Sequence, residues 1–189
     1  MSNTLLKKSL MEAPIVKKGQ YSYVIHPITD GIPEISPALL DEVTNELISL
    51  AKIKQPFNKI VTMEAMGIPL ASILSLKMNI PFTIIRKRSY DLAEEKIVKQ
   101  VTGYSTSTLS INGLNAGDAV IIVDDVLSTG GTLRAVLHTL QKMKVEVKAV
   151  FVAVDKGTNA EKITKETNIP VRALVKIAVE DGHLVFLDE

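Results

Sequence analysis

The stretch that decides the fold reads Ile121-Ile122-Val123-Asp124-Asp125-Val126-Leu127-Ser128-Thr129-Gly130-Gly131-Thr132-Leu133, within a chain of 189 residues. The apolar, mostly β-branched run from Ala119 to Val123 is typical of a buried strand. Behind it, apolar residues recur at i, i+3, i+4 and i+7, which predicts a helix with one face on a sheet; they are Leu133, Val136, Leu137 and Leu140. The small polar residues Ser128–Thr132 are therefore expected to form the turn between strand and helix.

This turn has the chemistry of a phosphate-binding loop. Gly130 and Gly131 can adopt positive φ and allow a ligand close to the backbone. The hydroxyl groups of Ser128, Thr129 and Thr132 can donate hydrogen bonds. The following helix N-terminus adds unpaired N–H groups and the positive end of the helix dipole.

The two carboxylates that precede the turn need a different partner. Asp124 and Asp125 cannot bind the same phosphate, because like charges repel. They must face ribose hydroxyls, a metal-bound water or a developing cation. A phosphate cradle beside two carboxylates therefore suggests a phosphorylated sugar that becomes positive during a reaction.

The run Val123–Thr132 resembles the phosphoribosyl-pyrophosphate (PRPP) motif of type I phosphoribosyltransferases, and the resemblance covers nearly the whole chain. The chain is most similar to the archaeal hypoxanthine/guanine phosphoribosyltransferases, in the adenine-phosphoribosyltransferase-like branch. The similar runs are His26–Gly31, Glu64–Ile68, Arg86–Tyr90 and Gln100–Tyr104. The resemblance implies transfer of the 5-phosphoribosyl group from PRPP to hypoxanthine or guanine, giving IMP or GMP and pyrophosphate.

Alternating strands and helices predict an α/β fold, with a mostly parallel central sheet flanked by helices. The expected strands are Tyr21–Ile25, Lys59–Met63, Pro81–Ile85, Val145–Val154 and Val171–Val179, with hairpins at Val98–Ile111 and around Asp181-Gly182. The expected helices are Thr4–Ala13, Ser36–Lys52, Pro69–Lys77 and Asn159–Glu166, and His26–Pro33 is expected to be a loop. The resemblance implies one domain over residues 1–189, with a small hood subdomain from about residues 1–35 and the C-terminal segment.

Two more segments are expected at the sheet edge that carries the turn. The resemblance implies that Ala65-Met66-Gly67 meets the pyrophosphate, mainly through backbone groups. Arg86-Lys87-Arg88 leaves the end of the next strand, where open α/β sheets bind ligands. We expect at least one of these three cations to bind pyrophosphate, to which Arg is suited by its bidentate geometry.

The choice of base depends on two positions. Adenine enzymes carry Glu-Tyr in a flexible loop, here at about residues 89–103, that closes over the reacting centre and excludes water. This chain has Gly103-Tyr104 there, and the missing carboxylate weighs against adenine. Lys156 ends a strand at the mouth of the site and can donate to O6 of a 6-oxopurine, although a solvated surface lysine is the alternative interpretation.

The resemblance implies that Asp124 and Asp125 are catalytic: they hold the ribose hydroxyls and stabilise a cationic sugar. Mg²⁺ is the implied cofactor. The resemblance implies that PRPP holds the ion and that no protein group binds it directly. A contact through a water molecule to Asp124 or Asp125 is compatible with this arrangement. The expected partners are PRPP and a purine base, and a homodimer is implied.

Composition excludes other classes. A net charge of +1 favours neither nucleic acid nor a membrane surface as a partner. The absence of cysteine excludes disulfides and a cysteine nucleophile, and fits a cytoplasmic location.

Three alternative functions remain: an adenine transferase, an orotate-type transferase, and a PRPP-sensing regulator without enzymatic activity. The regulator would need a DNA-binding module, and the residues before Tyr21 are too few for one.

Overall fold

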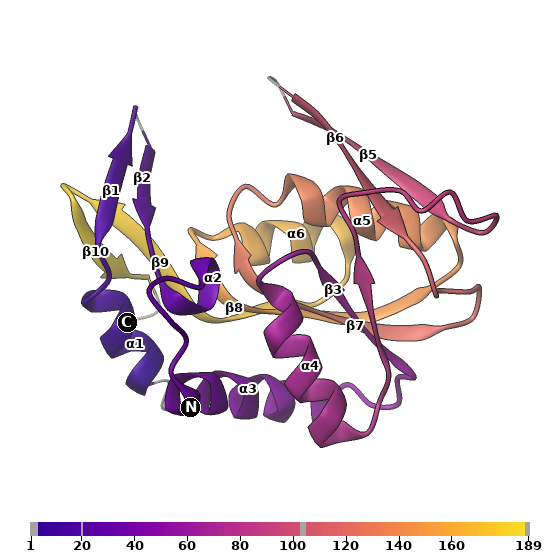
Figure 1. The fold of residues 1–189 in the computed structure, drawn as a ribbon, viewed down its shortest axis with the longest axis horizontal. Helices are drawn as coiled ribbons and strands as arrows, with labels where there is room; N and C mark the ends of the chain where they lie inside the picture. Colours follow the sequence, from indigo (N-terminus) through magenta and orange to yellow (C-terminus); the bar gives the residue numbers. More distant parts are fainter. Residues whose placement is uncertain (1–3, 20, 103–104, 188–189) are drawn as a thin grey trace.

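The computed structural model describes residues 4–19, 21–102 and 105–187. Its centre is a sheet with strand order β10-β9-β8-β7-β3-β4, in which only β10 runs antiparallel to its neighbour. The strands are β3 (Lys59–Met63), β4 (Phe82–Ile85), β7 (Ala119–Leu127), β8 (Glu146–Lys156), β9 (Val171–Glu180) and β10 (His183–Phe186). The mostly parallel α/β fold is confirmed (Figure 1).

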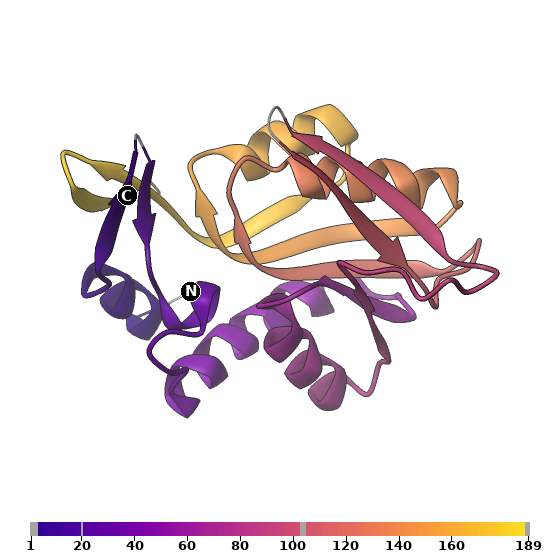
Figure 2. The same cartoon turned by 45° about the horizontal axis from the view of Figure 1, so that its top comes forward.

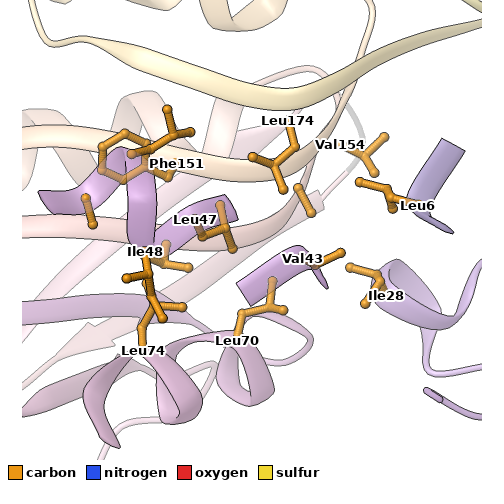
Figure 3. Close-up of a cluster of buried hydrophobic side chains, with 14 of the residues drawn as sticks. Leu6, Ile28, Val43, Leu47, Ile48, Leu70, Leu74, Phe151, Val154 and Leu174 are labelled. Carbon is orange, nitrogen blue, oxygen red and sulfur yellow. The ribbon is translucent and has the colours of Figure 1, made fainter. Parts of the chain in front are cut away.

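Helices cover both faces of this sheet (Figure 2). One face carries α3 (Pro37–Lys52) and α4 (Gly67–Met78), and the other carries α5 (Gly131–Lys142) and α6 (Asn159–Thr167). Side chains alternate across the strands, so Ile121 and Val123 of β7 join the first core while Val120 and Ile122 join the second. Figure 3 shows the first core, where Leu47 of α3, Leu70 of α4 and Phe151 of β8 are in one buried cluster.

Strand β7 is longer than the sequence predicts. The expected strand ended at Val123, but pairing with β8 continues to the Leu127–Asp155 pair. Pairing with β3 stops much earlier, at Val61 and Ile122. The final part of β7 therefore overhangs β3 with one edge unpaired by a strand, and Asp124 and Asp125 lie in this overhang. The turn is shorter than predicted, because α5 already begins at Gly131.

The segment expected as a loop after β2 contains a single helical turn, α2 (Pro27–Asp30). Pro27 occupies the first turn, where its missing N–H is harmless. His26 caps the turn by accepting a hydrogen bond from the N–H of Ile28 through Nδ1. Gly31 ends it in the left-handed conformation, with φ of 70°. The sequence-based loop assignment is therefore wrong for Pro27–Asp30, where these caps close a helical turn.

Early and late segments of the chain lie together at one end of the molecule (Figure 1). They are α1 (Thr4–Met11), the hairpin of β1 (Ile15–Lys18) and β2 (Tyr21–Val24), and β10. Glu42 of α3 accepts hydrogen bonds from the N–H groups of Leu5 and Leu6, and Lys7 Nζ lies 5.2 Å from the centre of the Phe186 ring. Strand β1 had no counterpart among the predicted elements.

A second hairpin, of β5 (Lys96–Thr102) and β6 (Ser105–Ile111), projects from the other end of the molecule (Figure 2). Its base is anchored by Val98, Leu109 and Ile111, which are buried in the second core. Before it, Glu95 organises a turn by accepting hydrogen bonds from Ser89, Tyr90, Asp91 and Asn112. None of the helices in the described ranges is long and apolar enough to cross a membrane.

Candidate active site

A cavity of about 700 Å³ opens at the carboxyl ends of β3 and β7. Its position follows from the overhang of β7, because the chain leaves β3 while β7 continues beside β8 alone. The cavity is lined by the predicted residues Asp124, Asp125, Ser128, Thr129, Gly130, Gly131, Thr132, Ala65, Met66 and Lys87. Segments from three separate parts of the sequence thus meet around one space.

The loop after β7 is shaped by Gly130. Its φ is 76°, a left-handed conformation that side-chain-bearing residues rarely adopt. A Cβ atom there would lie 2.6 Å from Cδ1 of Ile163 in α6, so a larger residue would also displace this side chain. The loop therefore exposes backbone groups to the cavity directly before the N-terminus of α5.

The acidic pair is buried at the floor of the cavity. Asp124 is 9% exposed and Asp125 is 7% exposed, and Asp124 Oδ1 accepts a hydrogen bond from the N–H of Asp125 at 3.1 Å. Burial raises the pKa of Asp124 well above its usual range, and the neighbouring charge of Asp125 raises it further. Burial also raises the pKa of Asp125 to about 6. Protein contacts therefore compensate these charges incompletely, and the pair favours additional positive charge.

Gly67 lies beneath Asp124 and outside the cavity lining. A Cβ atom at Gly67 would come within 2.2 Å of Thr62 Oγ1 and 2.6 Å of Asp124 Oδ1. The resemblance implied that this glycine meets the pyrophosphate, and in the structure its backbone also packs closely against the side chain of Asp124. Ala65 and Met66, immediately before it, do line the cavity, and the Glu64–Ala65 peptide is cis.

The three cations after β4 have different surroundings. Lys87 lines the cavity, and its charge opposes the raised pKa of Asp124. Arg86 instead forms an ion pair with Glu64, with Nε 2.8 Å from Oε2. Arg88 donates a hydrogen bond to the Tyr90 hydroxyl, and its guanidinium lies 4.8 Å from the centre of that ring.

Glu64 was not among the predicted site residues. It lines the cavity and accepts hydrogen bonds from both Arg86 Nε and the N–H of Lys87. These two bonds lower the pKa of Glu64. It therefore links the turn after β3 to the cationic segment after β4. Its presence in the run Glu64–Ile68 was the available signal, but its partner 22 residues away was not visible in the sequence.

Thr29, Thr108 and Leu109 also line the cavity without having been predicted. Thr29 comes from α2, and its neighbour Asp30 contributes a negative charge that adds to the raised pKa of Asp125. The other two come from β6, so the projecting hairpin forms one wall. Tyr104, the residue assigned to a flexible loop, lies outside the described residues.

Lys156 lines a neighbouring cavity of about 320 Å³. The other residues of this cavity are Ser22 and Val24 of β2, Gly157, and Ile177, Ala178 and Val179 of β9. The charge of Lys156 lowers the pKa of Asp125 against the larger effect of burial. The charge of Lys156 in the second cavity therefore acts on Asp125 in the first.

The acidic side chains of the site bear on metal binding. Among the residues that the structure describes, no group of three or more His, Cys, Asp or Glu side chains is arranged to hold a metal ion. Asp124 and Asp125 nevertheless provide oxygen donors of the kind that Mg²⁺ prefers, at a place where burial disfavours their negative charge. These two residues fit a cation that is held mainly by a ligand.

Comparison with known proteins agrees with this geometry. A family model described as "Phosphoribosyl transferase domain" matches residues 35–178. A hypoxanthine/guanine phosphoribosyltransferase from Methanothrix soehngenii is 49% identical, over 95% of this chain and 93% of the relative. One of the same name from Methanobacterium paludis is 50% identical, over 95% and 94%. The crystal structure of adenine phosphoribosyltransferase from Rhodothermus marinus superposes with a TM-score of 0.72 at 23% identity, covering 93% of this chain and 98% of that one.

Proposed function

This chain belongs to the phosphoribosyltransferase family, and we propose that it transfers the 5-phosphoribosyl group of PRPP to hypoxanthine or guanine in purine salvage. The products are IMP or GMP and pyrophosphate. The observation that carries this proposal is that the buried acidic pair and the glycine-containing loop line one cavity. The solved structure at 23% identity supports the fold and adds nothing about the choice of base.

The 5′-phosphate of PRPP would bind in the loop Ser128–Thr132. All five residues of this loop line the cavity, and the N-terminus of α5 favours negative charge there. This binding holds the ribose at a fixed place relative to the acidic pair. Positioning of this kind lowers the activation barrier, because the reacting atoms no longer lose their freedom during the chemical step.

Asp124 and Asp125 would hold the ribose hydroxyls. As a purine nitrogen attacks C1, the bond from C1 to the pyrophosphate oxygen breaks and its electron pair leaves with pyrophosphate. The ribose carries positive charge while the bond is breaking, and two buried carboxylates stabilise that charge more strongly than water does. The base loses its N–H proton, which either carboxylate can accept.

The leaving pyrophosphate would be met from the opposite wall. Ala65 and Met66 offer backbone groups there, and Lys87 offers an ammonium group. Glu64 holds the backbone of Lys87 in place. Arg86 and Arg88 are paired with Glu64 and Tyr90, so their contribution to pyrophosphate binding requires these contacts to rearrange.

We assign the purine to the cavity beside Lys156. Apolar side chains of β2 and β9 form its walls, which suit a flat aromatic base. The ammonium of Lys156 can donate a hydrogen bond to the O6 of hypoxanthine or guanine, whereas the 6-amino group of adenine is itself a donor. A site built on this bond rejects adenine because its donor would then face another donor.

Mg²⁺ would be held by the oxygens of PRPP, with Asp124 or Asp125 reaching it through water. When bound, the ion neutralises the charge of the departing pyrophosphate. The raised pKa values of the two carboxyl groups support this placement, because a nearby cation offsets the effect of burial. Removal of Mg²⁺ with a chelator is expected to abolish turnover, and its re-addition to restore it.

Three further features belong to the proposal. Tyr104 would lie in the loop that closes over the reacting centre, the protein would be a homodimer, and it would act in the cytoplasm. The last follows from the substrate, because a highly charged molecule such as PRPP does not cross a bilayer unaided. Sedimentation equilibrium measures the oligomeric state directly.

The decisive experiment measures pyrophosphate release from PRPP and Mg²⁺ with hypoxanthine, guanine, xanthine and adenine supplied separately. Turnover with hypoxanthine or guanine, and little with adenine, is the expected result. Turnover with adenine alone would replace the proposal by an adenine transferase. PRPP binding without turnover on any base would favour a PRPP-sensing regulator.

A further inference from the structure

We propose that Arg134, fixed by Glu166, is a positioning residue that presets the phosphate loop (Ser128–Thr132) before substrate binds. The inference rests on the proposed function of that loop. Arg134 is on α5 and Glu166 is on α6, and neither lines the cavity. Both act on the loop from its outer side.

The contacts form a short chain from α6 to the loop. Arg134 donates from Nε and Nη2 to the two carboxylate oxygens of Glu166, at 2.5 and 3.0 Å. Its remaining terminal nitrogen, Nη1, donates to the backbone carbonyl of Thr129 at 2.9 Å. A guanidinium held on two edges in this way has little rotational freedom, because the bidentate pair fixes its plane.

The bond to Thr129 decides which way a peptide group faces. In a trans peptide the carbonyl and the following N–H point to opposite sides of one plane. Arg134 holds the Thr129 carbonyl and does not itself line the cavity. The N–H of Gly130 is therefore directed away from Arg134 and, in this proposal, toward the cavity. A ligand phosphate would then find this donor already oriented.

The position of Arg134 near the N-terminus of α5 supports its role in positioning the loop. A cation in the first turns of a helix is disfavoured by the positive end of the helix dipole, and Arg134 follows the start of α5 at Gly131 closely. Glu166 offsets this unfavourable charge. Gly130 is also fitted to the arrangement, because a Cβ atom there would lie 2.7 Å from Arg134 Nη1.

The test compares binding of two ligands by calorimetry: ribose 5-phosphate, which uses the phosphate loop, and Mg²⁺-pyrophosphate, which does not. Arg134→Gln is expected to weaken ribose 5-phosphate binding by about tenfold or more, as expected for losing a preorganised bond near a charged ligand. Pyrophosphate binding should stay unchanged. In steady-state assays the KM for PRPP should rise more than kcat falls, because the phosphate is remote from C1.

Two variants separate positioning from simple attraction between charges. Arg134→Lys keeps the positive charge but loses the planar guanidinium that bonds to Glu166 and Thr129 at the same time. It should therefore bind ribose 5-phosphate nearly as weakly as Arg134→Gln. Glu166→Gln frees Arg134 from its partner, so weaker binding is expected; a role through charge alone would instead give tighter binding. Lys165→Gln, which removes an exposed positive charge from α6, is the matched control and should bind normally.

Normal ribose 5-phosphate affinity in both Arg134 variants would overturn the inference, as would tighter binding by Glu166→Gln. Equal weakening for both ligands, with a lowered Tm, would indicate general loosening and would also overturn it. Failure of the unaltered protein to bind ribose 5-phosphate would refute the proposed phosphate site itself. That outcome is distinguishable from a failure confined to the variants.

Discussion

The carboxyl group of Asp125 is buried beside a second aspartate, and burial raises its pKa to about 6. Its ionised form is the one proposed to stabilise the ribosyl cation. We therefore predict that kcat/KM for PRPP has fallen by about pH 6, because the pKa of Asp124 is raised as well, whereas an ordinary aspartate would still be charged at that pH. A pH profile of kcat/KM measures this. An acid limb that begins only near pH 4 would contradict the raised pKa.

Replacement of the same residue separates activity from stability. The folded-state pKa of Asp125 is above its unfolded value, so its ionisation opposes folding at pH 7 and this penalty disappears as the pH falls from about 6 toward 4. Asp125→Asn should lower turnover by about 10²-fold or more while leaving the Tm at pH 7 unchanged or raised. Unchanged turnover would refute the catalytic assignment.

His26 makes the stability of the fold depend on pH in the direction opposite to Asp125. Burial lowers its pKa from 6.5 to about 4, and its Nδ1 accepts a hydrogen bond from Ile28, so the folded protein holds it neutral. The unfolded chain binds a proton more readily below pH 6.5, and stability is therefore lost between about pH 6.5 and 4. From pH 7 to 4.5 this amounts to about 2 kcal/mol.

Denaturant unfolding of the protein and of His26→Asn at these two pH values checks the prediction. Asparagine can still cap α2 but does not titrate, so the variant should lose less stability on acidification. Comparison with the unaltered protein cancels the contribution of Asp124 and Asp125, which has the opposite sign. Identical pH dependence in both proteins would exclude His26 as its source.

At the scale of elements, the segment after β4 distributes three cations among three environments. Lys87 lines the cavity, whereas Arg88 packs on Tyr90. Lys87→Gln should therefore weaken pyrophosphate binding by about tenfold, and Arg88→Gln, the control of equal charge change, should have a smaller effect. Calorimetric titration with Mg²⁺-pyrophosphate distinguishes them. A larger effect at Arg88 would show that the segment rearranges when ligand binds.

The same elements show how far sequence reasoning reaches. Helix α3 was predictable because its signals are local: Ser36 caps it by accepting from the N–H of Leu39, and Pro37 occupies its first turn. The loop residues and acidic pair were predictable for the same reason. The end of β7 was not, because hydrogen bonds to β8 extend the strand beyond the change from apolar to acidic residues.

The site residues that were missed depend on partners distant in the sequence. Glu64 became recognisable only through its bonds to the segment after β4. The ion pair of Arg134 and Glu166 joins two helices that are separated by β8 along the chain. Local patterns identify the groups that can do chemistry, and the tertiary structure determines what holds them in place.

At the scale of the whole molecule, the proposed site is divided between two cavities from different parts of the fold. The cavity at Lys156 needs β2 from the start of the chain and β9 from its end. Lys156→Gln should lower kcat/KM for hypoxanthine by about 10²-fold while PRPP affinity stays normal. Parallel assays with hypoxanthine and adenine measure the change in preference. If PRPP affinity fell as much as kcat/KM for hypoxanthine, Lys156 would contribute to PRPP binding and not to the choice of base.

The overhang of β7 has a consequence for the protein without its substrate. Along Asp124–Leu127 the strand is paired with another strand on the β8 side only, and the substrate is proposed to bind beside the other edge. PRPP would then act as the missing neighbour and complete the architecture as well as react. Because a ligand that binds only the folded state raises its stability, the melting temperature itself should report which compounds the site accepts, even those that it cannot convert.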